Sequence, residues 1–143
     1  MEGSAAIRPP VPPAARALLR RSATDLIHGC AALSPGERYA AAHLAALRAA
    51  AAVLVVRRPP GKGGPRSVWE TLPRVAPEMA GWAAYFTSTA VLRAAVEAGR
   101  GEAIRAQDAD GLLRDAGTFH HAVEAFLGLP FQRILPDVLP VCG

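Results

Sequence analysis

The chain is poor in cysteine, lysine and aromatic residues, and each shortage narrows the folds and functions open to it. The two cysteines, Cys30 and Cys142, lie far apart and match no zinc-ligand spacing, so we expect reduced thiols rather than a disulfide framework or a zinc ribbon. Aromatic residues make up 6% of the 143 residues, so the core has to be mainly aliphatic. Long alternating runs of β-branched residues are also absent, and no segment has the pattern of a strand.

Segments that would direct the chain into a membrane are missing as well. The first 16 residues contain no apolar stretch of the kind found in signal peptides. The longest stretch of low charge, residues 39–56, is interrupted by His43 and Arg48 and consists mostly of alanine, which is too weakly apolar for a membrane span. We therefore expect a cytoplasmic protein that makes no membrane contact.

Local motifs for nucleotide hydrolysis, hydrolytic triads and metal centres are not found. Gly61-Lys62-Gly63 lacks the upstream glycine and the following Ser or Thr of a Walker loop. No Ser-His-Asp set and no paired carboxylates are marked by local sequence. His120, His121 and Glu124 have helical spacing at which they could meet a metal ion, but no further ligand is evident, so neither a metal site nor a cofactor is predicted.

What the chain has in abundance is alanine, at 31 positions. Alanine has the highest helix propensity, and its small side chain lets helices approach closely. A chain of 143 residues suits one domain that is stable without disulfides or metals. The net charge of +4 does not by itself imply nucleic-acid binding. These features predict a single all-α domain.

The chain divides into a Pro-rich arm (1–12), which is predicted to be disordered, a helical bundle (13–128) and a Pro-rich tail (129–143). The apolar residues of the tail are expected to pack back onto the bundle or onto a partner. Capping signals and breaks in the apolar periodicity predict helices over residues 13–32, 35–56, 67–73, 77–98 and 106–127. The capping signals are Ser34 and the pair Ser67 and Glu70 at two helix starts, and Gly128 at the end of the last helix.

The segment 35–56 is apolar on nearly every face, which is typical of a helix packed on several sides. We therefore place it at the centre of the bundle. The four aromatics at helical spacing in the next segments are interpreted as core rather than as a pocket lining: Trp69, Trp82, Tyr85 and Phe86.

The same segment, RYAAAHLAALRAAAAVL, resembles the signature helix of HEPN domains, in which an aromatic residue, small residues, a basic residue and an aliphatic run follow one another. The residues that carry the likeness are Tyr39, Ala42, Ala46, Arg48 and the pair Val53-Leu54. The following RRPPGKGGPRSVWETLPRVAPEMAGWAAYF is similar to an actinobacterial HEPN subfamily. The resemblance covers about residues 20 to 128. It implies an antiparallel four- to five-helix bundle, often a homodimer.

Many HEPN proteins are metal-independent ribonucleases with an Arg and a His four to six residues apart, whereas other members have lost this pair and serve as interaction or nucleotide-associated modules. Two places in the chain match the spacing. At the first, Arg38 is followed by Tyr39 rather than by the Asn, Asp or His that the family prefers. Helical geometry sets Arg38 and His43 about 140° apart. We interpret His43 as a packed histidine and Arg38 as a solvated arginine.

The second place is Arg114 with His120 or His121, where Asp115 follows the arginine as the family prefers. Arg114 and His121 lie within about 20° on one helix face and roughly 10 Å apart along the axis. This face is opposite the apolar stripe, so we expect it to be open to solvent or to a partner. His120 falls at the edge of that stripe, where a hydrogen-bonded core histidine is expected. A neutral imidazole can take the proton of a 2′-hydroxyl, and a guanidinium can stabilise the charge growing on the phosphate.

A basic loop offers a different site. Its cations could hold phosphates or a nucleic-acid backbone, and no aromatic residue lies within it to stack on bases. They are Arg57, Arg58, Lys62 and Arg66.

Three functions stay open from the sequence. The first is a non-catalytic dimerising module that binds a protein, nucleic-acid or nucleotide partner. The second is a metal-independent ribonuclease centred on Arg114 and His121. The third is a structural subunit of a toxin–antitoxin-like complex.

Overall fold

The computed structural model describes residues 10–58, 67–100 and 104–142, and these form five α-helices, one 3-10 turn and no strand. The predicted all-α bundle is therefore confirmed. The helix expected over residues 77–98 begins as a 3-10 turn, and the first helix ends slightly earlier than expected. In chain order the elements are α1 (Pro13–Cys30), α2 (Pro35–Val56), α3 (Val68–Val75), η2 (Pro77–Met79), α4 (Ala80–Glu97) and α5 (Ala106–Phe126).

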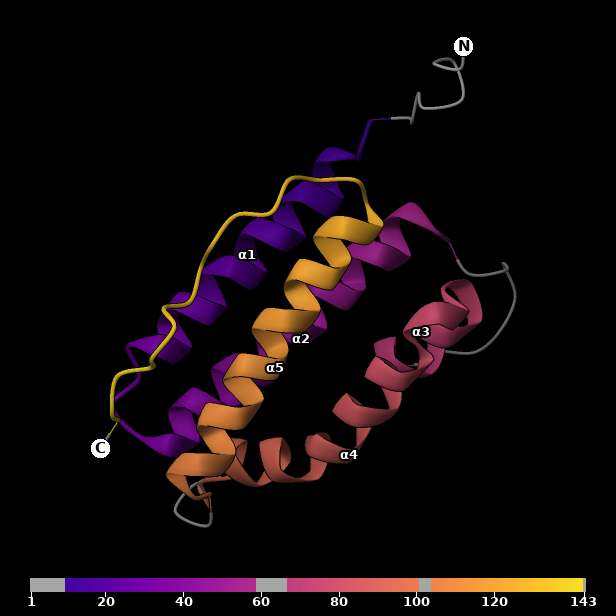
Figure 1. Ribbon diagram of the computed structural model, residues 1–143. Coiled ribbons are helices and arrows are strands. Elements are labelled where there is room, and N and C mark those ends of the chain that lie inside the picture. The colour runs from indigo at the N-terminus through magenta and orange to yellow at the C-terminus, as the bar shows by residue number, and fades with distance from the viewer. Residues whose placement is uncertain (1–9, 59–66, 101–103, 143) are drawn as a thin grey trace.

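The α2 helix is the centre of the bundle, as its composition predicts. It contacts α1, α3, α4 and α5. Figure 1 shows α1 running antiparallel to α2 and α5, with α3 and α4 to one side of these three helices. Alanines make this packing possible because they let the neighbouring helices approach on several sides of α2. Six of them have no exposed surface: Ala42, Ala45, Ala46, Ala49, Ala50 and Ala52.

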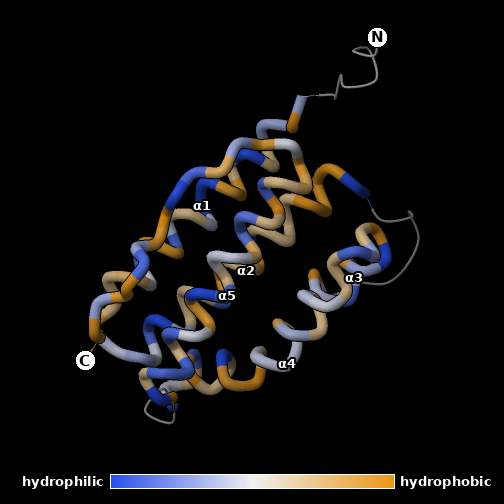
Figure 2. Tube along the Cα trace, in the orientation of Figure 1, coloured by the Kyte–Doolittle hydropathy of each residue, from blue (hydrophilic) through white to orange (hydrophobic). Residues whose placement is uncertain are grey.

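By length and composition α2 is apolar enough to cross a membrane, which corrects the expectation that this stretch is too weakly apolar, although half of its most apolar window is buried within the protein. Its four helical neighbours account for that apolarity in the way expected of a core helix. The end of α2 is strongly hydrophobic and turns hydrophilic just before the trace becomes grey (Figure 2).

Side-chain caps begin two of the helices where the sequence predicts them. The Ser34 hydroxyl accepts a hydrogen bond from the backbone N–H of Glu37 at the start of α2. At the start of α3, Ser67 and Glu70 form a reciprocal capping box. These bonds satisfy N–H groups that have no partner within the first turn of a helix.

A glycine ends α5 and turns the chain back along the bundle. Gly128 has φ of +74°, a left-handed conformation that favours glycine. Its N–H donates to the carbonyl of Ala125, and the next N–H, of Leu129, donates to the carbonyl of Glu124. This pair of bonds is a Schellman motif, so the C-cap predicted at Gly128 is confirmed.

After this turn the tail packs on the bundle, running back along α1 toward the end where α2 begins (Figure 1). Leu139 and Cys142 are buried there. Gly117 of α5 makes room for the tail, since a Cβ atom at this position would lie 2.9 Å from Cδ1 of Leu135. At the other terminus Val11 packs against the core, and residues 1–9 of the predicted arm lie outside the described residues.

The expected solvated position of Arg38 is wrong: its side chain has no exposed surface. The guanidinium donates to the carbonyls of Gly29 (2.9 Å), Cys30 (2.8 Å) and Pro140 (2.8 Å), and to the carboxylate of Asp110 at 2.5 Å. Carbonyls in the last turn of a helix have no partner within that helix. Arg38 donates to those of Gly29 and Cys30, and the N–H of Ala32 also donates to Gly29. One side chain thus joins α1, α2, α5 and the tail.

Aromatic side chains fill the core between α3, α4 and α5. Trp69 stacks on Phe86 with ring centroids 4.9 Å apart, and Phe119 of α5 lies 5.3 Å from Phe86. Trp82 and Tyr85 pack against the same core and are partly buried. The interpretation as core residues is confirmed for Trp69 and Phe86, whereas Trp82 and Tyr85 pack on the core and also line a surface cavity.

Candidate functional site

The α5 helix positions the three residues predicted for catalysis, and two of them share a cavity. Arg114 and His121 both line a cavity of about 380 Å³ that α5 forms with the tail. Arg114 is exposed and donates a hydrogen bond of 3.1 Å to the backbone carbonyl of Asp137. The face of α5 predicted to be open to solvent or to a partner is therefore partly covered by the chain's own tail.

His121 is held on both sides by its neighbours. Its Nδ1 lies 2.6 Å from Oε1 of Glu124, and its ring centroid lies 4.2 Å from that of Phe131 in the tail. Because a carboxylate only accepts hydrogen bonds, Nδ1 is the donor and Nε2 carries the free lone pair. The imidazole is thus oriented by a carboxylate in the way a general base needs, while Phe131 packs against its ring.

His120 faces inward, and only 2% of its surface is exposed. Its Nδ1 lies 2.8 Å from the hydroxyl of Ser22 on α1, and its Nε2 lies 3.5 Å from Oε2 of Glu124. Burial lowers the pKa of His120, against the opposing effect of the Glu124 charge, so the neutral imidazole is favoured. His120 is the hydrogen-bonded core histidine that its position on the apolar stripe predicts.

Ser22, His120 and Glu124 together have the residue types of a hydrolytic triad, which no local sequence pattern marks. Ser22 has no exposed surface, so its hydroxyl is closed to any substrate. The three side chains instead form a buried polar link between α1 and α5.

A second cavity, of about 430 Å³, opens on the other side of this link, between α1, α5 and the start of the tail. His120 and Glu124 line it together with the arginines Arg16, Arg20 and Arg133. Arg16 and Arg20 lie one helical turn apart on α1 and are exposed. Neither is among the site residues predicted from the sequence, although their spacing of four residues in a predicted helix places both on one helix face.

The basic loop is represented by its first two residues, since Lys62 and Arg66 lie outside the described residues. Arg57 donates to the carbonyl of Val75 and lies over the ring of Phe126, 4.4 Å from its centroid. Arg58 is exposed. The role predicted for these four cations in phosphate binding stays a prediction.

The first predicted pair, Arg38 with His43, does not come together. Arg38 binds the ends of α1 and the tail, whereas His43 contacts Trp69 edge-on and has its Nε2 3.1 Å from the carbonyl of Phe86. Burial lowers the pKa of His43. His43 is therefore a packed histidine, as expected.

Arg48, which carries part of the family likeness, pairs with Asp25 of α1 through both carboxylate oxygens, at 2.9 and 3.1 Å. Burial raises the pKa of Asp25, and the nearby Arg48 partly offsets that shift. This basic residue of the signature helix thus ties α2 to α1.

One of three comparisons with known proteins finds a match for this chain. No curated protein and no solved structure matches the chain. The family model described as SAV_6107-like HEPN matches residues 29–124. The matched region begins at the end of α1, includes α2, α3 and α4 whole, and ends at Glu124 in the last turns of α5. Because these residues are about two thirds of the chain and carry the helices around which it folds, the chain belongs to the SAV_6107-like HEPN family.

Proposed function

We propose that this HEPN domain is a non-catalytic dimerising module that binds RNA through the arginine-lined cavity between α1 and α5. The observation that carries the proposal is a contrast between two cavities. Arg114 and His121 are engaged by the chain's own tail and by Glu124. Arg16 and Arg20 pair with none of the described residues.

Cleavage of RNA by an Arg and a His requires the guanidinium and the imidazole to converge on one phosphate. The guanidinium of Arg114 donates to the backbone of Asp137, and Phe131 packs on the ring of His121. Both contacts compete with a phosphate for the two side chains. This geometry supports a binding role over a catalytic one.

The cavity beside α1 has the features of a phosphate-binding surface. Its rim carries the guanidinium groups of Arg16 and Arg20, which form paired hydrogen bonds with phosphate oxygens. Its walls include Leu19, Ile27 and Leu129, which offer apolar surface to a sugar or a base. The net charge of +4 favours the approach of an anionic chain.

A titration of labelled RNA followed by fluorescence anisotropy tests this role. We expect Arg16→Gln with Arg20→Gln to weaken binding at least about tenfold and to reduce the slope of log affinity against log salt by about 1.4, because two phosphate contacts are lost. The control is Arg74→Gln with Arg100→Gln, which removes the same charge from exposed positions outside the cavity.

Equal losses of RNA affinity in the two double variants would show that binding depends on net charge alone, and would overturn the proposed site. An unmodified chain that binds no RNA, but copurifies with a second protein, would favour the structural-subunit hypothesis instead.

Dimerisation is supported by an apolar patch on α4. Val91 is 76% exposed and Leu92 is 41% exposed. Exposed aliphatic neighbours of this kind are typical of surfaces that meet another protein, and a second copy of the chain is the partner we propose.

One observation favours the ribonuclease as a second candidate: Arg114 and His121 line the same cavity, and Glu124 orients the imidazole. This alternative predicts EDTA-resistant cleavage of RNA that depends on His121.

A further inference from the structure

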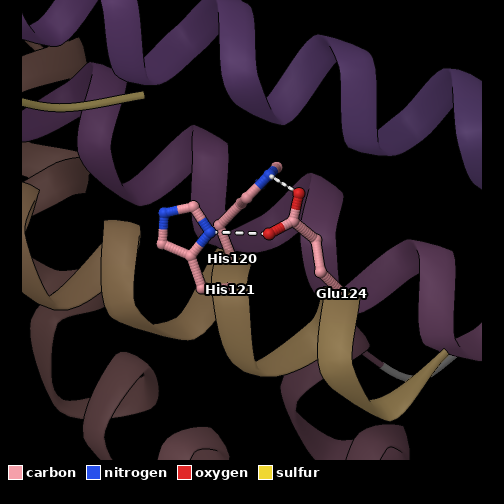
Figure 3. A group of neighbouring side chains, drawn as sticks. All are labelled: His120, His121 and Glu124. Atoms are coloured by element: carbon pink, nitrogen blue, oxygen red, sulfur yellow. Dashed lines mark hydrogen bonds and ion pairs between the residues drawn. The ribbon is translucent and has the colours of Figure 1, made fainter. Parts of the chain in front are cut away.

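Three potential metal-ligating side chains meet on α5 beside the arginine-lined cavity. One ligand atom from each of His120, His121 and Glu124 lies within 4.8 Å of the other two. Figure 3 shows the carboxylate of Glu124 beside the two imidazoles, with one oxygen directed to each ring. Helical spacing alone brings these residue types near one another, but it does not aim their ligand atoms at a common point. The structure adds that convergence.

The surroundings prepare His120 to ligate. Metal-bound histidines almost always donate the other ring N–H to a nearby acceptor, which fixes the tautomer and the direction of the ligating nitrogen. With an ion bound, the hydroxyl of Ser22, 2.8 Å from Nδ1, can accept that bond, which leaves the lone pair of Nε2 for an ion held between His120 and Glu124. Ser22 is wholly buried, so this contact is held by the packing of α1 on α5.

The geometry also leaves an open coordination position. His120 and Glu124 line the cavity of about 430 Å³, so an ion held between them faces that cavity. Two imidazoles and a carboxylate are the ligand types that Zn²⁺ and Co²⁺ accept, and three protein ligands with one open position form a known class of zinc site.

We propose that Nε2 of His120, Nδ1 of His121 and the carboxylate of Glu124 bind one divalent transition-metal ion of the zinc type. Binding through Nδ1 requires the other neutral tautomer of His121, so the ring proton moves from Nδ1 to Nε2 and the imidazole stays neutral. The fourth ligand is water or an anion from the cavity, where Arg16 and Arg20 favour negative charge. The inference is independent of RNA binding, and it removes His121 from use as a free base.

Co²⁺ titration of the full chain tests the site, since four- and five-coordinate Co²⁺ absorbs visible light far more strongly than the aqueous ion. We expect the visible band to saturate at one equivalent, and Zn²⁺ to abolish it by competition. Glu124→Gln and His121→Ala should each remove the band, whereas Ser22→Ala should weaken binding roughly tenfold. The control is His28→Ala, which removes an exposed histidine of α1 and should leave the titration unchanged.

Circular dichroism identifies any variant that fails to fold, and His121→Ala is the safer of the two ligand variants because its side chain is partly exposed. Absence of a saturating band in the unmodified chain would overturn the site. So would a band that persists in both ligand variants or disappears in His28→Ala. A thiolate-to-cobalt charge-transfer band would assign the ion to Cys30 or Cys142 and would equally overturn it.

Discussion

Replacing Arg38 by methionine should destabilise this domain more than any other single change at its polar residues. The guanidinium has no exposed surface and donates to three backbone carbonyls and to Asp110. Methionine fills a similar volume but leaves the carbonyls of Cys30 and Pro140 without the donor that Arg38 supplies, and that of Gly29 with the N–H of Ala32 alone. Leaving a buried backbone acceptor unpaired costs about 1–3 kcal/mol per group, and two such groups amount to a large part of the stability of a domain this size.

The same network provides its own control in Asp110→Asn. The side chain of Asp110 is 40% exposed, so water can solvate what the substitution leaves behind. We expect a loss of about 1 kcal/mol or less, because an ion pair open to solvent contributes little. Unfolding in urea, followed by tryptophan fluorescence, measures both variants.

If Arg38→Met unfolds within about 1 kcal/mol of the unmodified chain, the carbonyls do not depend on Arg38 and the reasoning fails. It fails equally if Asp110→Asn costs more than Arg38→Met, since the carboxylate and not the carbonyls would then dominate.

Three further predictions concern the core and the surface. Burial lowers the pKa of His43, so the unfolded chain binds more protons as the pH falls through about 6.5. The free energy of unfolding therefore falls between pH 7.5 and 5.5, by at most about 1.4 kcal/mol from this residue. Urea titrations at both pH values should show a smaller fall in His43→Gln, and an equal fall in the variant would exclude the contribution. Ala46→Leu should cost about 1–3 kcal/mol by overpacking the centre of α2, as measured by thermal unfolding, and an unchanged midpoint would contradict the close helix packing. Val91→Glu should shift the dimer proposed above to monomer in light scattering without changing the helical content, whereas a dimer that persists would place the interface elsewhere.

The helices could be predicted from local patterns because each depends on nearby residues. Ser34 and Ser67 cap helices through contacts three residues away, and Gly128 ends α5 through bonds within its last turn. The apolar residues around α2 likewise predicted its central position, since only several neighbours can cover a helix that is apolar on all sides.

The site depended on contacts that no local pattern contains. Helix geometry correctly places Arg38 and His43 on different faces of α2, but it does not predict that Arg38 is buried. Arg38 is buried because it binds the end of α1 and the carbonyl of Pro140, which is 102 residues away along the chain. Both cavities exist because the tail returns over α5, and a Pro-rich segment has no periodicity from which its path could be predicted. For the same reason Phe131 could not be placed on His121.

The most direct test of the account is incubation of the purified chain with mixed RNA in the presence of EDTA, followed by electrophoresis of the RNA. A binding module whose Arg114 and His121 are engaged by its own tail and by Glu124 leaves the RNA at full length, and the same result is expected for Arg114→Ala with His121→Ala. Cleavage by the unmodified chain that disappears in the double variant would contradict the account and establish the metal-independent ribonuclease in its place.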